Sequence, residues 1–277
     1  MSSSKEVALK DQWSKYAEQV ASTETISGAQ FISTKSGVLK FGDDVLPGNQ
    51  MLVIIADAVR ENTYYEGKYN AKESNPPKCY AFGREESEMV PGLILDNGKE
   101  RDLFAETDPK EEWFEPQNEE CAGCPMAEWG SSDTGRGKAC QNRRRLALVP
   151  AGICVPEGKR NFVDELFDDE ADILESDMAY LKVPVTSVKH WAKYVKEIAA
   201  LGRPWFGVIT RIYLEPDGEN QFSMRFELVE EVPDHLADAA IKRMEEARRS
   251  IIQPYRPPHE DSAQGVKGLK KTRRGSR

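Results

Sequence analysis

Short apolar runs separated by turn residues dominate this 277-residue chain, and their pattern predicts a mainly β protein. The unbroken apolar run at 51–56 is typical of a buried central strand. The stretch 221–228 instead alternates polar and apolar residues, as one half of a hairpin does. By the same reasoning we expect further strands at 30–34, 38–41, 146–149, 179–185 and 205–213.

Apolar residues recur at helical spacing in three segments, 5–21, 187–201 and about 234–252. Ser187 can cap the second helix, and Gly202 can end it. This helix precedes the last two predicted strands, which is the element order of an OB-fold, a five-stranded Greek-key barrel. We therefore predict a mainly β fold with helices, built as an OB-fold with a long, loop-rich insertion.

The insertion covers residues 60–143, which are irregular and contain several proline-bearing turns. Such a long stretch without regular structure needs something else to order it. The predicted organisation is an N-terminal helical arm at 1–25, an OB-fold core at 26–232 that includes the insertion at 60–143 and an acidic excursion at 157–177, a C-terminal helix at 233–253 and a disordered basic tail at 254–277.

Four of the five cysteines, Cys79, Cys121, Cys124 and Cys140, lie within the insertion. The central pair reads Cys-Ala-Gly-Cys, a compact turn that can aim two thiolates at one metal ion. Four thiolates make a closed tetrahedral site, which suits one structural Zn²⁺ better than catalysis. Zinc would also order the insertion, because metal binding contributes free energy of folding. The alternative is a set of ordinary buried thiols, which is our interpretation of Cys154.

The net charge of −9 argues against a simple basic coat for DNA, although its distribution matters more than its sum. Residues 164–177 carry eight acids and no base, which is nearly the whole excess of negative charge. The last eleven residues hold six bases. A locally basic groove is therefore compatible with the acidic total, and we interpret the tail as an arm that adds non-specific affinity for phosphate.

A glycine-rich loop precedes the last of the four cysteines and carries both bases and an aromatic ring. Arg136 and Lys138 are candidates for phosphate contacts, and Trp129 is a candidate for stacking on a base. The alternative is that Trp129 covers the metal site while the two bases are solvated.

Three consecutive arginines, Arg143, Arg144 and Arg145, open the strand after the insertion. Alternation along a strand divides them between its two faces, so one or two of them could line a groove. Their counter-charge would be phosphate or the acids at 164–177, and we favour phosphate.

A second basic and aromatic patch precedes the cysteine pair. It consists of Tyr64, Tyr65 and Tyr69 near Lys68 and Lys72, and the segment from Lys78 to Phe82 continues it. Stacking on such rings contributes about 1–3 kcal/mol per base and tolerates any sequence. This patch therefore favours non-specific binding of a single strand. The alternative is that these rings belong to the core of the sheet.

The acids at 164–177 lack the spacing of a calcium-binding loop, so their default interpretation is a solvated loop. A sharper alternative is that they mimic nucleic acid and occupy the groove when no ligand is bound. The sequence shows no phosphate-cradling glycine loop, nucleophile elbow, HExxH motif or kinase signature. We therefore expect no enzymatic activity.

The motifs around the cysteines carry a family resemblance. They are Pro77-Lys78-Cys79-Tyr80-Ala81, Cys121-Ala122-Gly123-Cys124-Pro125, Trp129-Gly130-Ser131 and Gly135-Arg136-Gly137-Lys138-Ala139-Cys140. With these motifs the chain resembles the single-stranded DNA-binding proteins of tailed bacteriophages, the T4-type helix-destabilising proteins among them. That family inserts a zinc-holding subdomain between the strands of an OB-fold. The resemblance implies cooperative, sequence-independent coating of single-stranded DNA in replication, recombination and repair.

The chain departs from this family in two respects. The T4-type zinc site uses one histidine and three cysteines, whereas this chain offers four cysteines. Many replication coat proteins end in an acidic tail that recruits partners, whereas this chain ends in bases. Recruitment of partners through the C-terminus is therefore in doubt.

We predict a non-enzymatic protein that coats and protects single-stranded DNA, with replication or recombination proteins and further copies along the DNA as its other partners. Phosphates would be held by Arg143, Arg144, Arg145, Arg136, Lys138 and Lys78, and bases would stack on members of the set Tyr64, Tyr65, Tyr69, Phe82 and Trp129. Two alternatives stay open. One is a zinc-containing accessory subunit of a phage nucleic-acid enzyme, and the other is an acidic interaction protein that mimics DNA.

The expected location is the cytoplasm, that of the host cell if the chain is phage-encoded. No apolar run approaches the ~20 residues of a membrane-spanning helix, so we expect no membrane partner. The first residues also lack the apolar core of a secretion signal.

Overall fold

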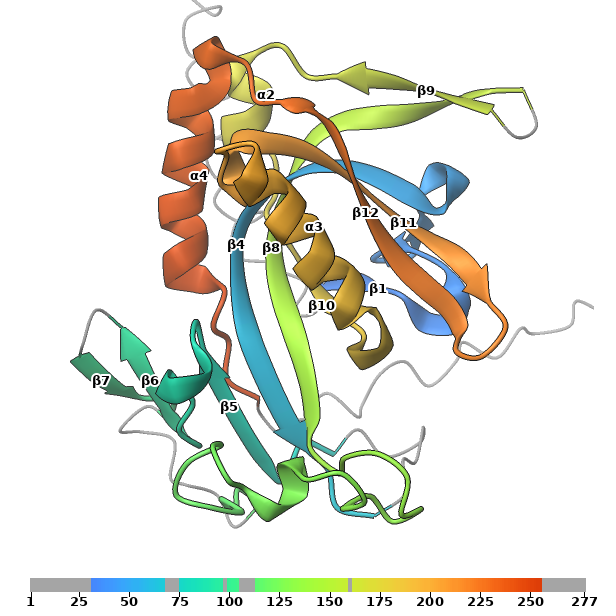
Figure 1. The fold of residues 1–277 in the computed structure, drawn as a ribbon. Helices are drawn as coiled ribbons and strands as arrows, with labels where there is room; N and C mark the ends of the chain where they lie inside the picture. The colour runs from blue at the N-terminus through green and yellow to red at the C-terminus, as the bar shows by residue number, and fades with distance from the viewer. Residues whose placement is uncertain (1–30, 68–74, 97–98, 105–112, 159–160, 256–277) are drawn as a thin grey trace, which may run out of the picture. The chain divides into compact units, whose positions relative to one another are not determined.

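A computed structural model describes residues 31–67, 75–96, 99–104, 113–158 and 161–255 of the chain (Figure 1). The predicted N-terminal arm, Tyr69 and the basic tail from residue 256 onward lie outside the described residues. Among the residues that are described, no helix has the length and apolarity needed to cross a membrane.

The fold is mainly β and is built around a mixed sheet of ten strands. The strands follow the order β12-β11-β4-β8-β10-β1-β2-β3, with β5 beside β4 and β9 beside β8. Strand β1 is parallel to β10, whereas β11 is antiparallel to both β12 and β4. Within the described residues this order has two open ends and no closed barrel forms.

The strands of this sheet are β1 (Phe31–Ser33), β2 (Lys40–Phe41), β3 (Asp44–Val45), β4 (Gln50–Tyr64), β5 (Cys79–Gly83), β8 (Gln141–Glu157), β9 (Asn161–Leu166), β10 (Ala179–Val183), β11 (Val208–Asp217) and β12 (Gln221–Glu231). A separate hairpin joins β6 (Leu93–Asp96) and β7 (Lys99–Asp102). The α-helices are α2 (Glu170–Glu175), α3 (Val188–Ala200) and α4 (Ala237–Ser250).

The chain forms two compact units. The first contains residues up to 56, 147–182 and 189–244, and the second contains 57–146, 183–188 and the residues from 245 onward. Strands β4 and β8 and helix α4 contribute residues to both units.

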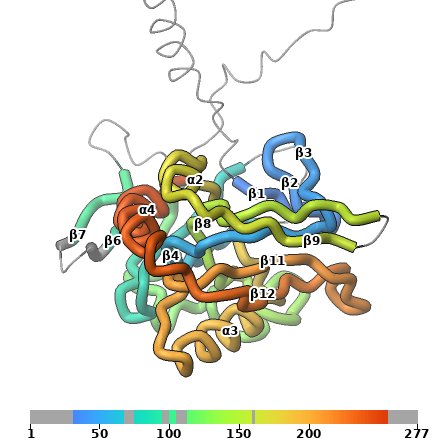
Figure 2. Tube along the Cα trace, turned by 90° about the horizontal axis from the view of Figure 1, so that it is seen from above, coloured from blue at the N-terminus to red at the C-terminus, as the bar shows by residue number. Residues whose placement is uncertain are grey.

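In the first unit, α3 packs beside the β11–β12 hairpin (Figures 1 and 2). The apolar face predicted for this helix, Val188, Trp191, Val195 and Ile198, is confirmed in part: Trp191 and Ile198 are buried together with Tyr194, whereas Val188 and Val195 are half-buried. The ring of Trp191 meets that of Phe226 edge-on, with centroids 5.4 Å apart. The Tyr194 hydroxyl is hydrogen-bonded to the hydroxyl of Thr210 over 2.5 Å. The predicted order of helix, strand and strand is therefore present.

The acidic stretch at 157–177 has more regular structure than a solvated loop, although seven of the eight acids at 164–177 are exposed as predicted. Residues 161–166 pair with β8 as strand β9. The next residues form α2, whose first turn is capped by the Asp169 carboxylate accepting from the Ala171 N–H. Ile173 on this helix is 1% exposed. Pairing of β9 with β8 and burial of Ile173 thus give regular structure to a segment that its composition alone predicted to be a solvated loop.

In the second unit, β5 pairs with the end of β4 and gives the insertion more regular structure than we predicted. The register places Glu61 opposite Phe82 and Asn62 opposite Ala81. Side chains alternate between the faces of a strand, so Glu61 and Phe82 share one face. Asn62 and Tyr64 lie on the other face, where Tyr64 stands opposite Cys79.

An aromatic core orders the face that carries Phe82. The Tyr80 ring lies within 6.2 Å, centroid to centroid, of Phe82, Phe104, Trp113, Phe114 and Tyr255. Tyr80 and Phe82 are almost completely buried. Large buried rings provide much of the free energy that stabilises a core. Apolar packing therefore orders part of the insertion, for which the sequence had suggested a metal as the source of order.

Candidate metal centre and nucleic-acid interface

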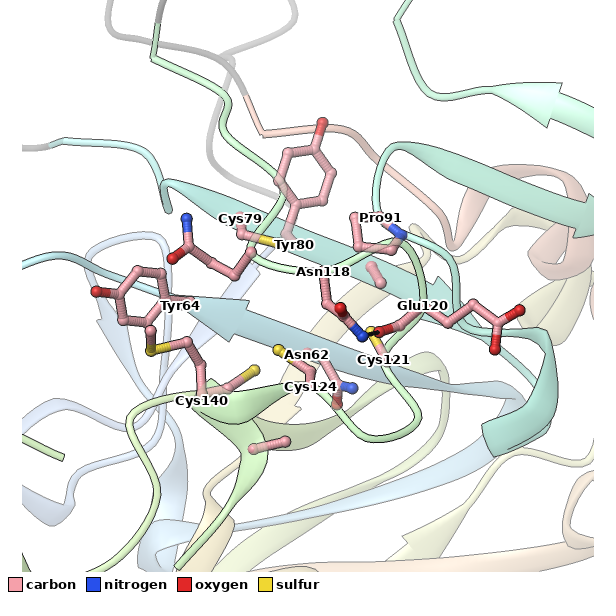
Figure 3. A pocket seen from close by; sticks show the side chains of 14 residues that line it. Asn62, Tyr64, Cys79, Tyr80, Pro91, Asn118, Glu120, Cys121, Cys124 and Cys140 are labelled. Atoms are coloured by element: carbon pink, nitrogen blue, oxygen red, sulfur yellow. Dashed lines mark hydrogen bonds between the residues drawn. The ribbon is translucent and has the colours of Figure 1, made fainter. Parts of the chain in front are cut away.

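The four cysteines of the insertion line one small cavity of about 20 Å³ in the second unit (Figure 3). Cys79 is the first residue of β5, and Cys140 immediately precedes β8. Cys121 and Cys124 flank the turn before the short 3-10 helix η4 (Pro125–Ala127). The cavity has room for about one water-sized particle. Three segments that are distant in the sequence thus bring their thiols to one place.

Backbone hydrogen bonds hold these segments together. The Cys121 N–H donates to the carbonyl of Met89 over 3.0 Å, and the Cys140 N–H donates to that of Met126 over 2.7 Å. Within the turn, the Cys124 N–H donates to the Cys121 carbonyl over 3.3 Å. Gly123 has a φ of +70°, a conformation that favours glycine, as the Cys-Ala-Gly-Cys motif predicted.

Four thiols are a donor set that a soft metal ion prefers, although the sulfur atoms do not converge on one point. All five cysteines are free thiols. Among the described residues, no three His, Cys, Asp or Glu side chains stand at the spacing of metal ligands. Four thiols at one cavity are nevertheless the ligand class that zinc takes in structural sites. A zinc ion there would have to draw the sulfurs inward. Cys154, which is 7% exposed, does not line the cavity.

Burial raises the pKa of three of the cavity cysteines, Cys79, Cys121 and Cys140, and so favours their protonated thiols when no cation is bound. Burial, with a smaller contribution from the neighbouring thiolates, raises the pKa of the Cys79 thiol to about 11 and that of Cys140 to about 12. Burial also raises the pKa of Cys121, which a hydrogen bond from Asn62 partly offsets. A bound cation reverses these effects, because metal ligation releases the thiol protons.

Trp129 lies on the loop that connects the cysteine turn to Cys140, and it is 82% exposed. This loop is held by its own hydrogen bonds. The Gly130 N–H donates to the Gly137 carbonyl over 2.8 Å. The Ser131 hydroxyl donates to the Glu128 carbonyl over 2.7 Å and accepts from the Ala139 N–H over 2.9 Å. The indole of Trp129 is therefore accessible to a ligand, on a loop whose own hydrogen bonds hold its conformation.

Arg136 and Lys138 lie on the same loop, and both are exposed. No salt bridge involving either one is found within the described part of the chain. The structure therefore presents two cations and one large ring on a single loop of about ten residues, as the sequence suggested.

The three arginines at the start of β8 have different environments. Arg145 is 1% exposed and forms an ion pair with Glu61, with 2.5 Å between Nε and Oε2. It has no surface to offer a phosphate, so its predicted role as a phosphate contact does not fit the structure. Arg143 and Arg144 are half-buried. Burial and the neighbouring Arg60 lower the pKa of Arg144.

The aromatic patch predicted from the sequence is divided by the structure. Phe82 is fully buried and Tyr64 is half-buried, whereas Tyr65 is 40% exposed. Lys78 bridges two acids, with its Nζ 2.6 Å from Glu66 and 3.1 Å from Glu115. Phe82 thus belongs to the core of the sheet, as the alternative interpretation had it, and Tyr65 remains the accessible ring.

Sequence reasoning missed two residues that hold this face of the sheet. Glu61 is fully buried and accepts from Arg145, and the hydroxyl of Tyr255 donates to its second oxygen. Glu61 lies beyond the predicted end of its strand, and Tyr255 lies beyond the predicted last helix. An acid that follows an apolar strand, together with an arginine on a second strand, was the available signal.

The chain matches no protein-family model, no curated protein and no solved structure.

Proposed function

We propose that this protein binds single-stranded DNA without sequence preference and without enzymatic activity. The observation that carries the proposal is the loop with Trp129, Arg136 and Lys138. The exposed indole of Trp129 offers a flat face, and stacking on such a face tolerates any sequence because all bases have one. Two adjacent cations supply the contacts to phosphate that such stacking needs.

The strand order supports an OB-type framework for this function. Five of the strands follow the order β12-β11-β4-β8-β10, and α3 lies between β10 and β11 in the sequence. An OB-fold connects its strands in this way, with a helix after the third strand. The insertion between β4 and β8 then corresponds to the loop between the first two strands, a loop with which OB-folds bind oligonucleotides. We propose that this sheet is an open form of that barrel.

The four-cysteine cavity supports one structural zinc ion as part of the proposal. Cys79, Cys121, Cys124 and Cys140 would hold the ion, and it would fix the base of the Trp129 loop through Cys124 and Cys140. Four thiolates leave no open position for a water ligand, so this ion would stabilise the fold and would not activate a nucleophile.

A fluorescence polarisation titration tests the function. Labelled single-stranded and duplex oligonucleotides of equal length are titrated with the full chain at several salt concentrations. We expect much tighter binding to the single strand, and a linear fall of log affinity with log salt, with a slope of about −0.7 for each phosphate contact.

Equal affinity for the two forms would contradict the proposal. No binding to either form, together with a tight protein partner, would instead favour the accessory subunit of a nucleic-acid enzyme. No binding to DNA, together with loss of the protein's biological effect when the exposed acids Asp168, Asp169 and Glu170 are neutralised, would favour a DNA mimic.

A further inference from the structure

Residues 251–255, which we call the C-terminal strap, follow α4 in the second unit. Nη1 of Arg145 donates to the carbonyl of Ile251 over 3.2 Å and to that of Gln253 over 3.1 Å. The Tyr255 hydroxyl donates to Oε1 of Glu61. Two buried charged side chains from β4 and β8 therefore hold the strap at three points.

The ring of Tyr255 is enclosed by aromatic faces and a cation. It stacks on Phe82 with 9° between the ring planes and 6.4 Å between the centroids. It meets Tyr80 edge-on at 5.1 Å. The guanidinium of Arg145 lies 5.8 Å from the centre of the Tyr255 ring and 4.4 Å from that of Phe82. The site thus receives a flat ring that carries a hydrogen-bond donor at its edge.

A buried ion pair between Glu61 and Arg145 is not needed merely to anchor the end of a chain. The side chains of Glu61 and Arg145 are 0% and 1% exposed. A buried ion pair stabilises a fold weakly, because the loss of hydration offsets much of the attraction. An aromatic platform beside a carboxylate and a guanidinium is also what recognises a nucleobase, since bases stack on rings and donate amino or imino hydrogens to acids.

Tyr65 marks where this site meets solvent. Its side chain is 40% exposed, and its hydroxyl is within hydrogen-bonding reach of Tyr255. Burial raises the pKa of the Tyr65 hydroxyl, and the positive charge of nearby Arg143, on β8, partly offsets this rise. A nucleotide that replaced the Tyr255 ring would therefore have a second ring and a cation beside it.

We propose that Tyr255 occupies a nucleobase site of this protein, and that single-stranded DNA displaces the C-terminal strap in order to bind there. This inference rests on the proposed function, whose ligand it places at a second position. The strap acts as an autoinhibitory contact: it lowers the apparent affinity for DNA by the fraction of molecules in which the site is open.

The first test compares Tyr255→Ala and Tyr255→Phe in the full chain. The labelled single strand is titrated at one salt concentration, and circular dichroism and thermal unfolding check that each variant folds. Tyr255→Ala empties the site, so its affinity should rise by about tenfold if the site is open in about a tenth of wild-type molecules. Tyr255→Phe keeps the ring and should bind within a few-fold of wild type. A folded Tyr255→Ala protein with unchanged or weaker affinity would overturn the inference.

The second test uses the wild-type protein and does not depend on a variant that folds. Hydrogen–deuterium exchange is followed in peptides that cover the strap, with and without a saturating mixed-sequence oligonucleotide of 20 nucleotides. We expect faster exchange in the strap when DNA is bound. Slower or unchanged exchange would show that the strap stays in place, and the inference would be wrong.

The two tests separate the inference from the function on which it rests. If wild-type protein binds the single strand while the strap keeps its protection, the inference fails and the proposed function stands. If the protein does not bind the single strand at any salt concentration, both fail.

Discussion

Trp129 is the residue whose environment speaks most directly for a ligand, because its ring is 82% exposed on a hydrogen-bonded loop. Replacing it by alanine should weaken binding to single-stranded DNA by about 1–3 kcal/mol, the usual contribution of one stacked base. Polarisation titrations would show this as a rise in Kd. Trp129→Phe is the matched control, since it keeps a stacking face and should lose less. Unchanged affinity in Trp129→Ala would remove this ring from the interface.

Alanine substitutions of Arg145 and Arg136 should have different effects: the first should lower stability, and the second should weaken DNA binding. Arg145→Ala leaves Glu61 buried without its partner and should lower the free energy of unfolding by about 3–5 kcal/mol, measured by urea denaturation. Arg136→Ala removes an exposed cation and should change stability by less than about 0.5 kcal/mol, while it weakens DNA binding and flattens the salt dependence. An Arg145→Ala protein of unchanged stability would contradict the structural role of this ion pair.

At the residue scale, the sequence identified which side chains could act as ligands, but it did not show which of them are buried. The cysteine spacing led to four residues that do line one cavity. The run of three arginines gave no means of telling Arg145, with its buried partner, from its half-buried neighbours, because Glu61 is 84 residues away in the sequence. A partner so distant in the sequence leaves no local signal. For the same reason, Phe82 was grouped with exposed rings although it is fully buried.

At the scale of elements, alternation and apolar runs predicted β10, β11, β12 and α3 well. Strands β4 and β8 extend much further than predicted, to 15 and 17 residues. The additional residues of β4 include the charged Glu61, which pairs inside the fold with Arg145 of β8. Apolar patterning cannot predict strand residues whose burial depends on an ion pair.

The cysteine turn allows a sharp test at the scale of one element. Cys124→Ser removes a proposed ligand, so elemental analysis should find less than stoichiometric zinc, and the second unit should lose thermal stability. Cys154→Ser is the control, because Cys154 is also buried but does not line the cavity. Equal zinc content in the two variants would show that this cavity is not the metal site.

For the whole molecule, two different features stabilise the insertion in our account: an aromatic core and a metal site. An aromatic core around Tyr80 packs one face of β5, and the cysteine cavity lies on the other face. In our proposal the rings pack without metal, whereas the ion adds stability to the cysteine turn and to the base of the Trp129 loop, beyond what their own hydrogen bonds supply. Loss of zinc should therefore loosen the binding loop more than the rest of the protein.

The most direct test of the account is a single-strand titration of the purified, reduced protein before and after chelation, with zinc measured in the same samples. The account predicts one zinc per chain, tight binding to the single strand, and loss of most of that affinity when the metal is removed, with recovery on adding zinc back. Protein that contains no stoichiometric zinc, or that binds single-stranded DNA equally well without it, would contradict the account.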